Sequence, residues 1–534
     1  MNFCKSKFLL SFLFIFSITA GVFAQENRNW QNLDYAKDSV MGVSVEKAYA
    51  ELLKGKKSEP VIVAVLDGGV EISHKDLKRV IYKSKKEKLN GKDDDHNGYI
   101  DDVNGWNFLG NATQDVDFET LELVRQIRKL KRKFAESNLD SAEKVSNPEY
   151  KKLLLMQDDY IKQYETANRT FIGVAGFKKT LDQMESKMNK DSLNISGFTK
   201  YKTTDPAEAF TRKAVLETLE DESIDYSTFK ANEIDKAYNY YYEKLNYHLN
   251  LNYSPRTALG INDNTAFYGN NHVTGPDALH GTHVAGIIAA DRKNRIGING
   301  VANNVKILGV RMVPNGDERD KDVANAIRYA VDQGAKVINM SFGKSYSDDK
   351  KIVDDAVKYA VSKDVLLVHA AGNDNKNLDI DNNFPNRNYE GNSGIASSWL
   401  EVGASGPKNN ESLKASFSNY GKTTVDVFAP GVEIYSTVPG SKYESLNGTS
   451  MASPVVSGIA ALIRSYYPSL TATQVKKIIM DSSVKINHSV DLMVDNKAAQ
   501  INFSDLSISG GVVNAYNAIK MAASLVNGTV ANYQ

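Results

Sequence analysis

The sequence contains a single cysteine, Cys4, among 534 residues. One cysteine cannot form an internal disulfide, so the chain does not belong to the disulfide-stapled secreted proteins. Net charge is also absent, because 65 Lys and Arg balance 65 Asp and Glu. This balance excludes a global attraction to nucleic acid or to acidic membrane surfaces. Hydrophobic residues, by contrast, make up 42% of the chain, too large a share for a mostly disordered protein.

Cys4 lies in an N-terminal segment typical of a secretory signal peptide. Two lysines precede a mostly apolar run over residues 8–20, and Val22 and Ala24 are small residues at the −3 and −1 positions of a cleavage site. We predict that residues 1–24 are removed and that the mature protein is periplasmic or extracellular, with no stable membrane span. An uncleaved membrane anchor is the alternative, because an apolar run of about 17 residues is at the lower limit for crossing a bilayer.

The length leaves room for about two to four domains, or for one large α/β domain with an insertion. Short apolar runs over residues 61–66, 306–310, 336–340 and 365–370 are typical of buried parallel strands. Helical patterns, such as that of residues 322–331, separate them. This alternation predicts βαβ units around a parallel sheet, with functional residues in the loops after the strands.

Residues 112–258 differ from the rest of the chain. They contain few glycines and show helical spacing, for example in Leu123, Ile127, Leu130 and Phe134. We predict a mainly helical insertion that divides a catalytic domain into residues 25–111 and 259–534. The basic residues between 125 and 133 have no aromatic residues among them, which favours a solvated helix face over a nucleic-acid site.

Three loops carry the residue types of nucleophilic catalysis. Asp67 follows an apolar run, His280 opens an Ala- and Gly-rich helical segment, and Ser450 stands at the start of another. A hydroxyl becomes a nucleophile when an imidazole takes its proton and a third group orients that imidazole. Taken singly, Asp67 also fits a loop cap, Ser450 a helix N-cap and His280 a surface histidine.

Together, and in this order, the three motifs resemble those of the subtilisin-like serine proteases, the subtilases. The resemblance covers about residues 40–110 and 270–525, and it includes the segments 370–373, 415–421 and 428–431. It implies a three-layer αβα fold with a central, mostly parallel sheet, to which the helical segment is added. The order Asp, His, Ser is itself a known feature of that family.

The resemblance also implies a role for each matching residue. Ser450 would attack the scissile carbonyl, His280 would carry the proton, and Asp67 would orient the imidazole. Asn373 would supply the side-chain donor of the oxyanion hole. His283 lies one helical turn beyond His280 and is expected to be a packed structural residue.

Substrate binding follows from the same comparison. Ser341, Phe342 and Gly343 resemble the segment that pairs with an extended peptide by adding a strand. The loop that contains Asp379 and Asp381 is expected near the base of the first specificity pocket. There these residues would favour Lys or Arg at the cleavage position, or they are solvated charges or metal ligands.

A separate acidic loop predicts a structural calcium ion. Oxygen-bearing side chains alternate around Gly98 with the spacing of an EF-hand-type loop, although no Glu closes it. The alternative is a polar turn without metal. The predicted Ca²⁺ ligands are Asp93, Asp95, Asn97, Asp101 and Asp102.

Two departures from the family pattern leave questions open. The segment between Asp67 and His280 is far longer than in simple subtilases, and it fits a lid, a docking surface or a folding aid. The stretch before the first strand is too short for the usual inhibitory propeptide.

The residues therefore predict an exported serine endopeptidase that acts on proteins or peptides, needs no cofactor for catalysis and binds no nucleic acid. A catalytically silent binding protein and an ester hydrolase are the alternatives.

Overall fold

The computed structural model describes residues 28–221, 224–261, 267–494 and 497–528. The predicted signal peptide, residues 1–24, lies outside these ranges. The described chain divides into two compact units. One contains residues 29–168 and everything from residue 242 onward, and the other contains residues 169–241.

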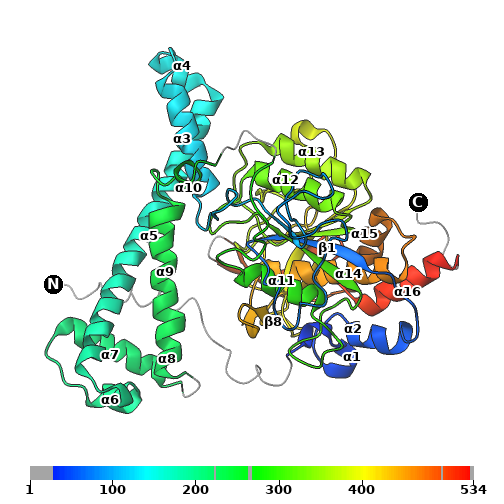
Figure 1. Cartoon of the computed structure of the whole chain (residues 1–534). Helices are drawn as coiled ribbons and strands as arrows, with labels where there is room; N and C mark the ends of the chain where they lie inside the picture. The colour runs from blue at the N-terminus through cyan, green and yellow to red at the C-terminus, as the bar shows by residue number, and fades with distance from the viewer. Residues whose placement is uncertain (1–27, 222–223, 262–266, 495–496, 529–534) are drawn as a thin grey trace. The chain divides into compact units, whose positions relative to one another are not determined.

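Nine strands in the described part of the larger unit form one sheet (Figure 1). All neighbouring strands are parallel except β10 and β13. Their order across the sheet is β10 (Val484–Lys485), β13 (Gly511–Val512), β7 (Val427–Pro430), β6 (Trp399–Ser405), β5 (Leu366–Ala370), β4 (Val337–Met340), β1 (Val61–Asp67), β3 (Val305–Arg311) and β2 (Gly105–Asn107). The four strands predicted from apolar runs are β1, β3, β4 and β5, so that prediction is confirmed.

Helices cover both faces of the sheet, because alternate residues of each strand point to opposite sides. In β1, Val63 and Val65 pack into one core, and Ala64 and Leu66 pack into the other. The first core includes residues of α11 (Leu279–Ala289), α14 (Thr449–Tyr466), α15 (Ala472–Asp481) and α16 (Ala515–Val526). The second includes residues of α12 (Asp320–Asp332) and α13 (Lys350–Ser362). The predicted three-layer αβα architecture is therefore confirmed.

The register of the central strands aligns their carboxyl ends. Leu66 of β1 lies opposite Met340 of β4, and Met340 lies opposite His369 of β5. The residues that follow these three strands therefore emerge side by side along one edge of the sheet.

Smaller elements surround this sheet. Two antiparallel hairpins consist of β8 (Ile434–Val438) with β9 (Lys442–Leu446), and of β11 (Ser489–Val494) with β12 (Lys497–Asn502). The short helices α1 (Tyr35–Asp38) and α2 (Val45–Lys47) precede β1.

The predicted helical region, residues 112–258, contains the helices from α3 to α10. In the larger unit, apolar residues of α3 (Glu122–Ala135) pack against Leu153 and Met156 of α5. Its other helices are α4 (Ser141–Ser146), the first part of α5 (Pro148–Lys187) and α10 (Pro255–Ala258). The smaller unit has its own core, to which Leu181, Phe198 and Val215 belong. It contains the end of α5, α6 (Ile195–Lys200), α7 (Pro206–Leu219), α8 (Tyr226–Phe229) and most of α9 (Lys236–Glu243).

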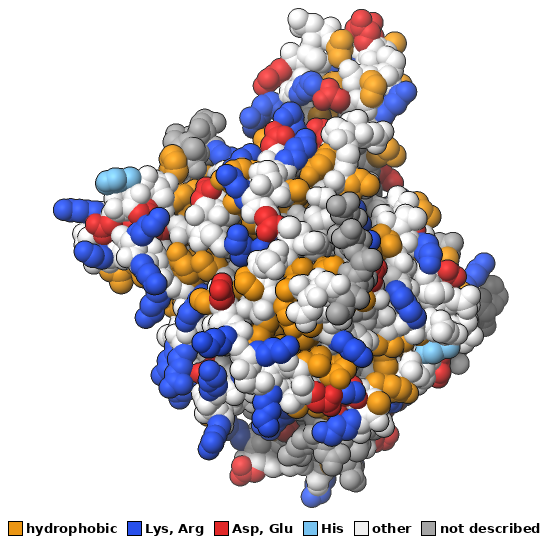
Figure 2. Space-filling model, turned by 90° about the vertical axis from the view of Figure 1, so that its right-hand side faces the viewer, with side chains coloured by type: hydrophobic (Ala, Val, Ile, Leu, Met, Phe, Trp, Pro, Cys, Tyr) orange, Lys and Arg blue, Asp and Glu red, His pale blue; other side chains and the backbone are white. Residues whose placement is uncertain are grey.

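The basic residues of α3 do not form one solvated face. Lys129, Lys131, Arg132 and Lys133 are exposed, as predicted. The Arg125 side chain is only 10% exposed and lies 2.6 Å from Glu122, so the prediction is wrong for this residue. Figure 2 shows that Lys and Arg on one face of the molecule are interspersed with acidic and hydrophobic side chains.

No helix within the described ranges combines the length and the apolar character that a bilayer crossing requires.

Candidate active site

Asp67 and His280 form a hydrogen-bonded pair at the carboxyl edge of the sheet. Asp67 ends β1, and His280 is the second residue of α11. His280 Nδ1 lies 2.8 Å from Asp67 Oδ1 and 3.0 Å from Oδ2. Because an ionised carboxylate can only accept, Nδ1 is the donor, and Nε2 of the neutral ring is left as the base.

The close approach of α11 to β1 depends on Gly281. A Cβ atom at this position would lie 2.2 Å from the carbonyl oxygen of Gly69 and 3.0 Å from Cβ of Asp67. A larger residue would push His280 away from Asp67. The glycine after the histidine is therefore a steric requirement of the pair.

The pKa of His280 reflects two opposing influences. Burial lowers it, but the adjacent Asp67 carboxylate outweighs burial, so the pKa lies above its usual value of 6.5. The Asp67 side chain is 3% exposed, whereas that of His280 is 41% exposed. The imidazole is therefore accessible to a substrate, and the carboxylate is not. His283 is buried, and burial lowers its pKa to about 4, in keeping with the structural role expected for it.

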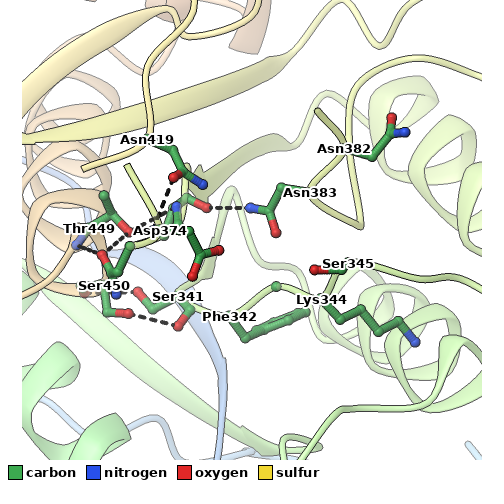
Figure 3. A pocket seen from close by; sticks show the side chains of 14 residues that line it. Ser341, Phe342, Lys344, Ser345, Asp374, Asn382, Asn383, Asn419, Thr449 and Ser450 are labelled. Atoms are coloured by element: carbon green, nitrogen blue, oxygen red, sulfur yellow. Dashed lines mark hydrogen bonds between the residues drawn. The ribbon is translucent and has the colours of Figure 1, made fainter. Parts of the chain in front are cut away.

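Ser450 is the second residue of α14, beside the end of β4. Its Oγ donates to the carbonyl oxygen of Ser341 at 3.1 Å, and Ser341 Oγ donates to the Ser450 carbonyl at 3.0 Å (Figure 3). Among the described residues, no hydrogen bond joins Ser450 to His280. A serine hydroxyl changes direction by rotation about one bond, and catalytic hydrogen bonds are often loose before substrate binds.

Asn373 is held in one orientation by Thr449. Asn373 Oδ1 accepts from the backbone N–H and from the hydroxyl of Thr449, both at 2.9 Å. The amide Nδ2 therefore points the other way, and a Cβ atom on Gly448 would lie 3.5 Å from it. This arrangement presents an N–H donor beside the start of α14, where the first backbone N–H groups of a helix are also unpaired within the helix.

A cavity of about 270 Å³ opens beside Ser450 (Figure 3). It brings together the predicted substrate segment, the predicted oxyanion residue and the predicted nucleophile. The lining residues are Ser341, Phe342, Gly343, Lys344, Ser345, Ala370, Gly372, Asn373, Asp374, Asn382, Asn383, Asn419, Thr449 and Ser450.

Asn383 shapes one wall of this cavity. Its Nδ2 donates to the carbonyl oxygens of Ala370 and Ala371 at 3.2 and 3.1 Å. A Cβ atom on Gly343 would lie 2.4 Å from Asn383 Oδ1, so the substrate segment needs glycine at this position. Asn383 carries no motif that would predict this position from the sequence, because its partners are backbone carbonyl groups.

The acidic residue that lines the cavity is Asp374, not Asp379 or Asp381. Asp379 accepts hydrogen bonds from the backbone N–H and hydroxyl of Thr423 and from the hydroxyl of Thr424. Its carboxylate therefore stabilises a turn. Asp381 is exposed, and the described lining residues include neither of the two.

The acidic loop brings together carboxylates of Asp93, Asp95 and Glu87, which each offer an oxygen within 4.8 Å of the others. Glu87 is 5% exposed, and its Oε1 accepts from the backbone N–H of Asp95 at 2.8 Å. Its Oε2 is buried and has no hydrogen-bond partner in the described chain. A carboxylate oxygen in this state fits a cation, which would balance the charge of the group. Glu87 was not among the predicted ligands, because it lies outside the alternating motif.

The remaining predicted ligands have other contacts. Asp101 accepts from the backbone N–H groups of Asn90 and Gly91, so its carboxylate closes the loop. Asp102 is fully buried, and its Oδ2 accepts from Asn97 Nδ2 at 3.0 Å and from the hydroxyl of Tyr329 at 2.8 Å, whereas its Oδ1, like Glu87 Oε2, has no hydrogen-bond partner in the described chain. Burial raises the pKa of Asp102 to about 6, although these two hydrogen bonds oppose the rise.

Comparison with known proteins agrees with this geometry. The model of the Subtilase family matches residues 58–504. The chain belongs to the subtilase family. The matched range includes eight of the nine strands of the sheet, all but β13, and the loops that carry Asp67, His280, Asn373 and Ser450.

Curated relatives of this subtilase include serine proteinases. It is 39% identical over 241 residues to the thermophilic serine proteinase of Bacillus sp. (strain AK1), which covers 45% of this chain and 52% of that protein. It is 38% identical over 260 residues to thermitase of Thermoactinomyces vulgaris, which covers 48% of this chain and 78% of thermitase. The subtilase thus spans about half the length of the first relative and about three quarters of the second.

A solved structure similar to this chain is that of proteases from Pseudoalteromonas arctica PAMC 21717, with 31% sequence identity and a TM-score of 0.38. The match covers 46% of this chain and 70% of the other. Because this TM-score is too low to establish a shared fold, the fold assignment rests on the strand order and the family match.

Proposed function

We propose that this subtilase is an exported serine endopeptidase that hydrolyses peptide bonds through a Ser-His-Asp triad and an acyl-enzyme intermediate. The observation that carries the proposal is the pairing of His280 Nδ1 with Asp67 at 2.8 Å. It fixes the imidazole as a base at the sheet edge that also carries Ser450 and the cavity.

In the proposed acylation step, Ser450 Oγ attacks the scissile carbonyl carbon and His280 Nε2 takes the hydroxyl proton. The oxyanion accepts hydrogen bonds from Asn373 Nδ2 and from the backbone N–H of Ser450. When the C–N bond breaks, His280 returns the proton to the leaving amine. Asp67 stays ionised and stabilises the imidazolium.

In the proposed deacylation step, water is the nucleophile and Ser450 is the leaving group. A water molecule gives a proton to His280 Nε2 and attacks the acyl carbon, and the same donors hold the oxyanion. The bond to Ser450 Oγ then breaks, and Oγ recovers its proton from His280. The acid product leaves, and the enzyme returns to its starting state.

Peptide substrates are favoured over simple esters by the segment Ser341–Gly343, which lines the cavity that contains Ser450. An extended peptide that pairs with this segment would gain main-chain hydrogen bonds, and the cavity would take the side chain at the cleavage position. Phe342 is 9% exposed and contributes to the lining of that cavity.

Fluorophosphonate labelling tests this function. A fluorophosphonate should label the purified protein, and Ser450→Ala should abolish labelling and lower kcat on peptides by roughly 10⁶-fold, because the nucleophile is gone. Ser445→Ala is the matched control, since Ser445 is exposed on β9. A folded wild-type protein without Ser450-dependent labelling would identify a silent binding protein, and a labelled protein that cleaves only esters would identify an ester hydrolase.

The pH dependence of kcat/KM tests the role of His280. The neutral ring is the active form, so kcat/KM should fall as the pH drops through a pKa above 6.5. Asp67→Asn removes the charge that raises this pKa. It should move the acid limb to lower pH and reduce kcat/KM by about 10⁴-fold. A wild-type limb at or below pH 6.5 would contradict the assignment.

A structural Ca²⁺ ion bound by Glu87, Asp93 and Asp95 is part of the proposal. Support comes from the buried, unpartnered Oε2 of Glu87 within the described chain and from the proximity of the three carboxylates. Asp102 joins the loop to α12 through Tyr329, so ion binding would strengthen the contact between the loop and the sheet. The ion has no part in the catalytic steps.

Chelation tests the calcium site. Removal of Ca²⁺ should lower the melting temperature by about 3 °C, which is the effect of a ligand present at about one hundred times its Kd. Glu87→Gln should remove most of this calcium dependence. Asp94→Asn should not, because Asp94 is exposed and lies outside the three-carboxylate group. An unchanged melting temperature in the chelated wild type would exclude the site.

Export rests on the N-terminal sequence. If residues 1–24 are a cleaved signal peptide, mass spectrometry of the protein from the periplasm or the medium should find Gln25 as the first residue. Replacement of Ala24 by a bulky residue should block processing, because signal peptidase sites need small side chains. Recovery of the full-length chain with Met1 from the membrane fraction would instead support the anchor.

A further inference from the structure

Lys344 is a buried cation immediately after the substrate segment Ser341–Gly343. Its side chain is only 1% exposed. Figure 3 shows it at the end of the segment farther from Ser450, with its side chain directed away from the cavity. A buried ammonium group is costly unless each of its N–H donors has a partner.

Lys344 has three such partners. Nζ lies 2.7 Å from Asp320 Oδ1, 2.8 Å from the carbonyl oxygen of Glu318 and 3.4 Å from Glu122 Oε2. Asp320 begins α12, whereas Glu122 is the first residue of α3 at the base of the helical insertion. One side chain therefore links the substrate segment to the sheet domain and to the insertion.

The start of α3 is attached to the same place by further contacts. The backbone N–H of Glu122 donates to Asp317 Oδ2 at 2.8 Å. Arg125 donates to the carbonyl oxygens of Asp317 and Glu318, both at 3.0 Å, and pairs with Glu122 at 2.6 Å. The Glu122 side chain is 4% exposed, so its negative charge is balanced by Arg125 and Lys344 and not by water.

The substrate segment is thus fixed at both ends. At one end, the hydroxyl of Ser341 is hydrogen-bonded to Asn339 and to the Ser450 carbonyl. At the other end, the Lys344 backbone exchanges two hydrogen bonds with Phe384, at 2.9 and 3.0 Å, and its side chain enters the ion cluster. A peptide that adds a strand needs such a rigid edge.

We propose that Lys344 is a positioning residue for peptide substrates, through which Glu122 and Arg125 of the helical insertion hold the segment Ser341–Gly343 in the geometry for strand pairing. The inference rests on the proposed peptidase function. By this proposal, the base of the insertion contributes to substrate binding. Its position in the sequence, far from Ser341 and Ser450, does not indicate such a role.

The proposal separates two classes of substrate. A peptide that extends several residues on the acyl side of the scissile bond pairs with the whole segment and depends on its far end. An ester of one amino acid occupies only the Ser450 end of the cavity, whereas Lys344 lines its opposite end (Figure 3). Loss of Lys344 should therefore weaken binding of the extended peptide and leave the short ester almost unaffected.

Lys344→Met tests this, since it removes the charge at similar volume. For a tetrapeptide amide we expect kcat/KM to fall about 10- to 100-fold, mainly through KM, because the segment is misplaced. Single-residue ester hydrolysis and Ser450-dependent fluorophosphonate labelling should stay within about twofold of wild type. Glu122→Gln, which keeps the side-chain shape, should act in the same direction and carries the test if Lys344→Met does not fold.

Lys476→Met is the matched control. Lys476 is 16% exposed, lies 3.5 Å from Asp426 and is not among the described residues that line the cavity. It should lower stability without changing KM. Equal losses on ester and peptide, or peptide losses as large in Lys476→Met, would overturn the proposal and make Lys344 a stability residue only.

A double-mutant cycle tests the link to the insertion. The effects of Lys344→Met and Glu122→Gln on KM should be less than additive, because both act through one contact. Additive effects would contradict the coupling. Failure of the peptidase function itself would appear differently, as wild-type protein that is labelled or folded but hydrolyses no peptide.

Discussion

The parallel pairing of β1, β4 and β5 is the constraint on which the active-site region depends. Because Leu66, Met340 and His369 lie in register across these strands, the chain leaves all three at one edge. Asp67, Ser341 and Asn373 are consequently neighbours although they are far apart in sequence. The other two residues of the proposed triad, His280 and Ser450, come from helices on one face of the sheet. α11 carries His280, and α14 carries Ser450.

Much of this could be predicted from the sequence, because buried parallel strands leave continuous apolar runs and the loops after them carry the reactive residues. Asp67 could be placed in this way, whereas the role expected for Asn373 came from the resemblance to the subtilases. Glu87 could not be placed, because its proximity to Asp93 depends on how a long loop folds back on itself. Asp101 has the spacing of a calcium ligand, yet its carboxylate binds the backbone N–H groups of Asn90 and Gly91. Residue spacing alone does not distinguish these two uses of a carboxylate.

The attachment of the insertion was also beyond sequence reasoning. Helical periodicity correctly placed Leu123 and Ile127 on one apolar helix face, and both are buried. The lack of aromatic residues among the basic ones, however, had favoured a solvated face for Arg125. In the structure, Arg125 is buried against carbonyl oxygens of a segment almost 200 residues away. Charged residues have no periodic pattern that identifies their partners.

Near Lys344 the acids outnumber the bases, and burial raises the pKa of Glu318 to about 7. The cluster can therefore hold this carboxyl group in its neutral form near neutral pH.

The described part of the chain contains no cysteine, and buried cations connect the loops at the carboxyl edge of the sheet. Arg311, at the end of β3, is 1% exposed and donates to the carbonyl oxygens of Gly68 and Val116 and to Asn107 Oδ1. It thereby joins the loop after Asp67 to β2 and to the start of the insertion. Lys344 joins the segment Ser341–Gly343 to the start of α12 and to the start of α3. Each of these cations contacts at least two other segments of the chain, whereas a disulfide joins one pair of residues. Several of their partners are backbone carbonyl oxygens, which no side-chain substitution removes. Through Arg311 and Lys344, residues 116–122 are therefore fixed beside the loops that follow β1 and β4, from which Asp67 and Ser341 extend.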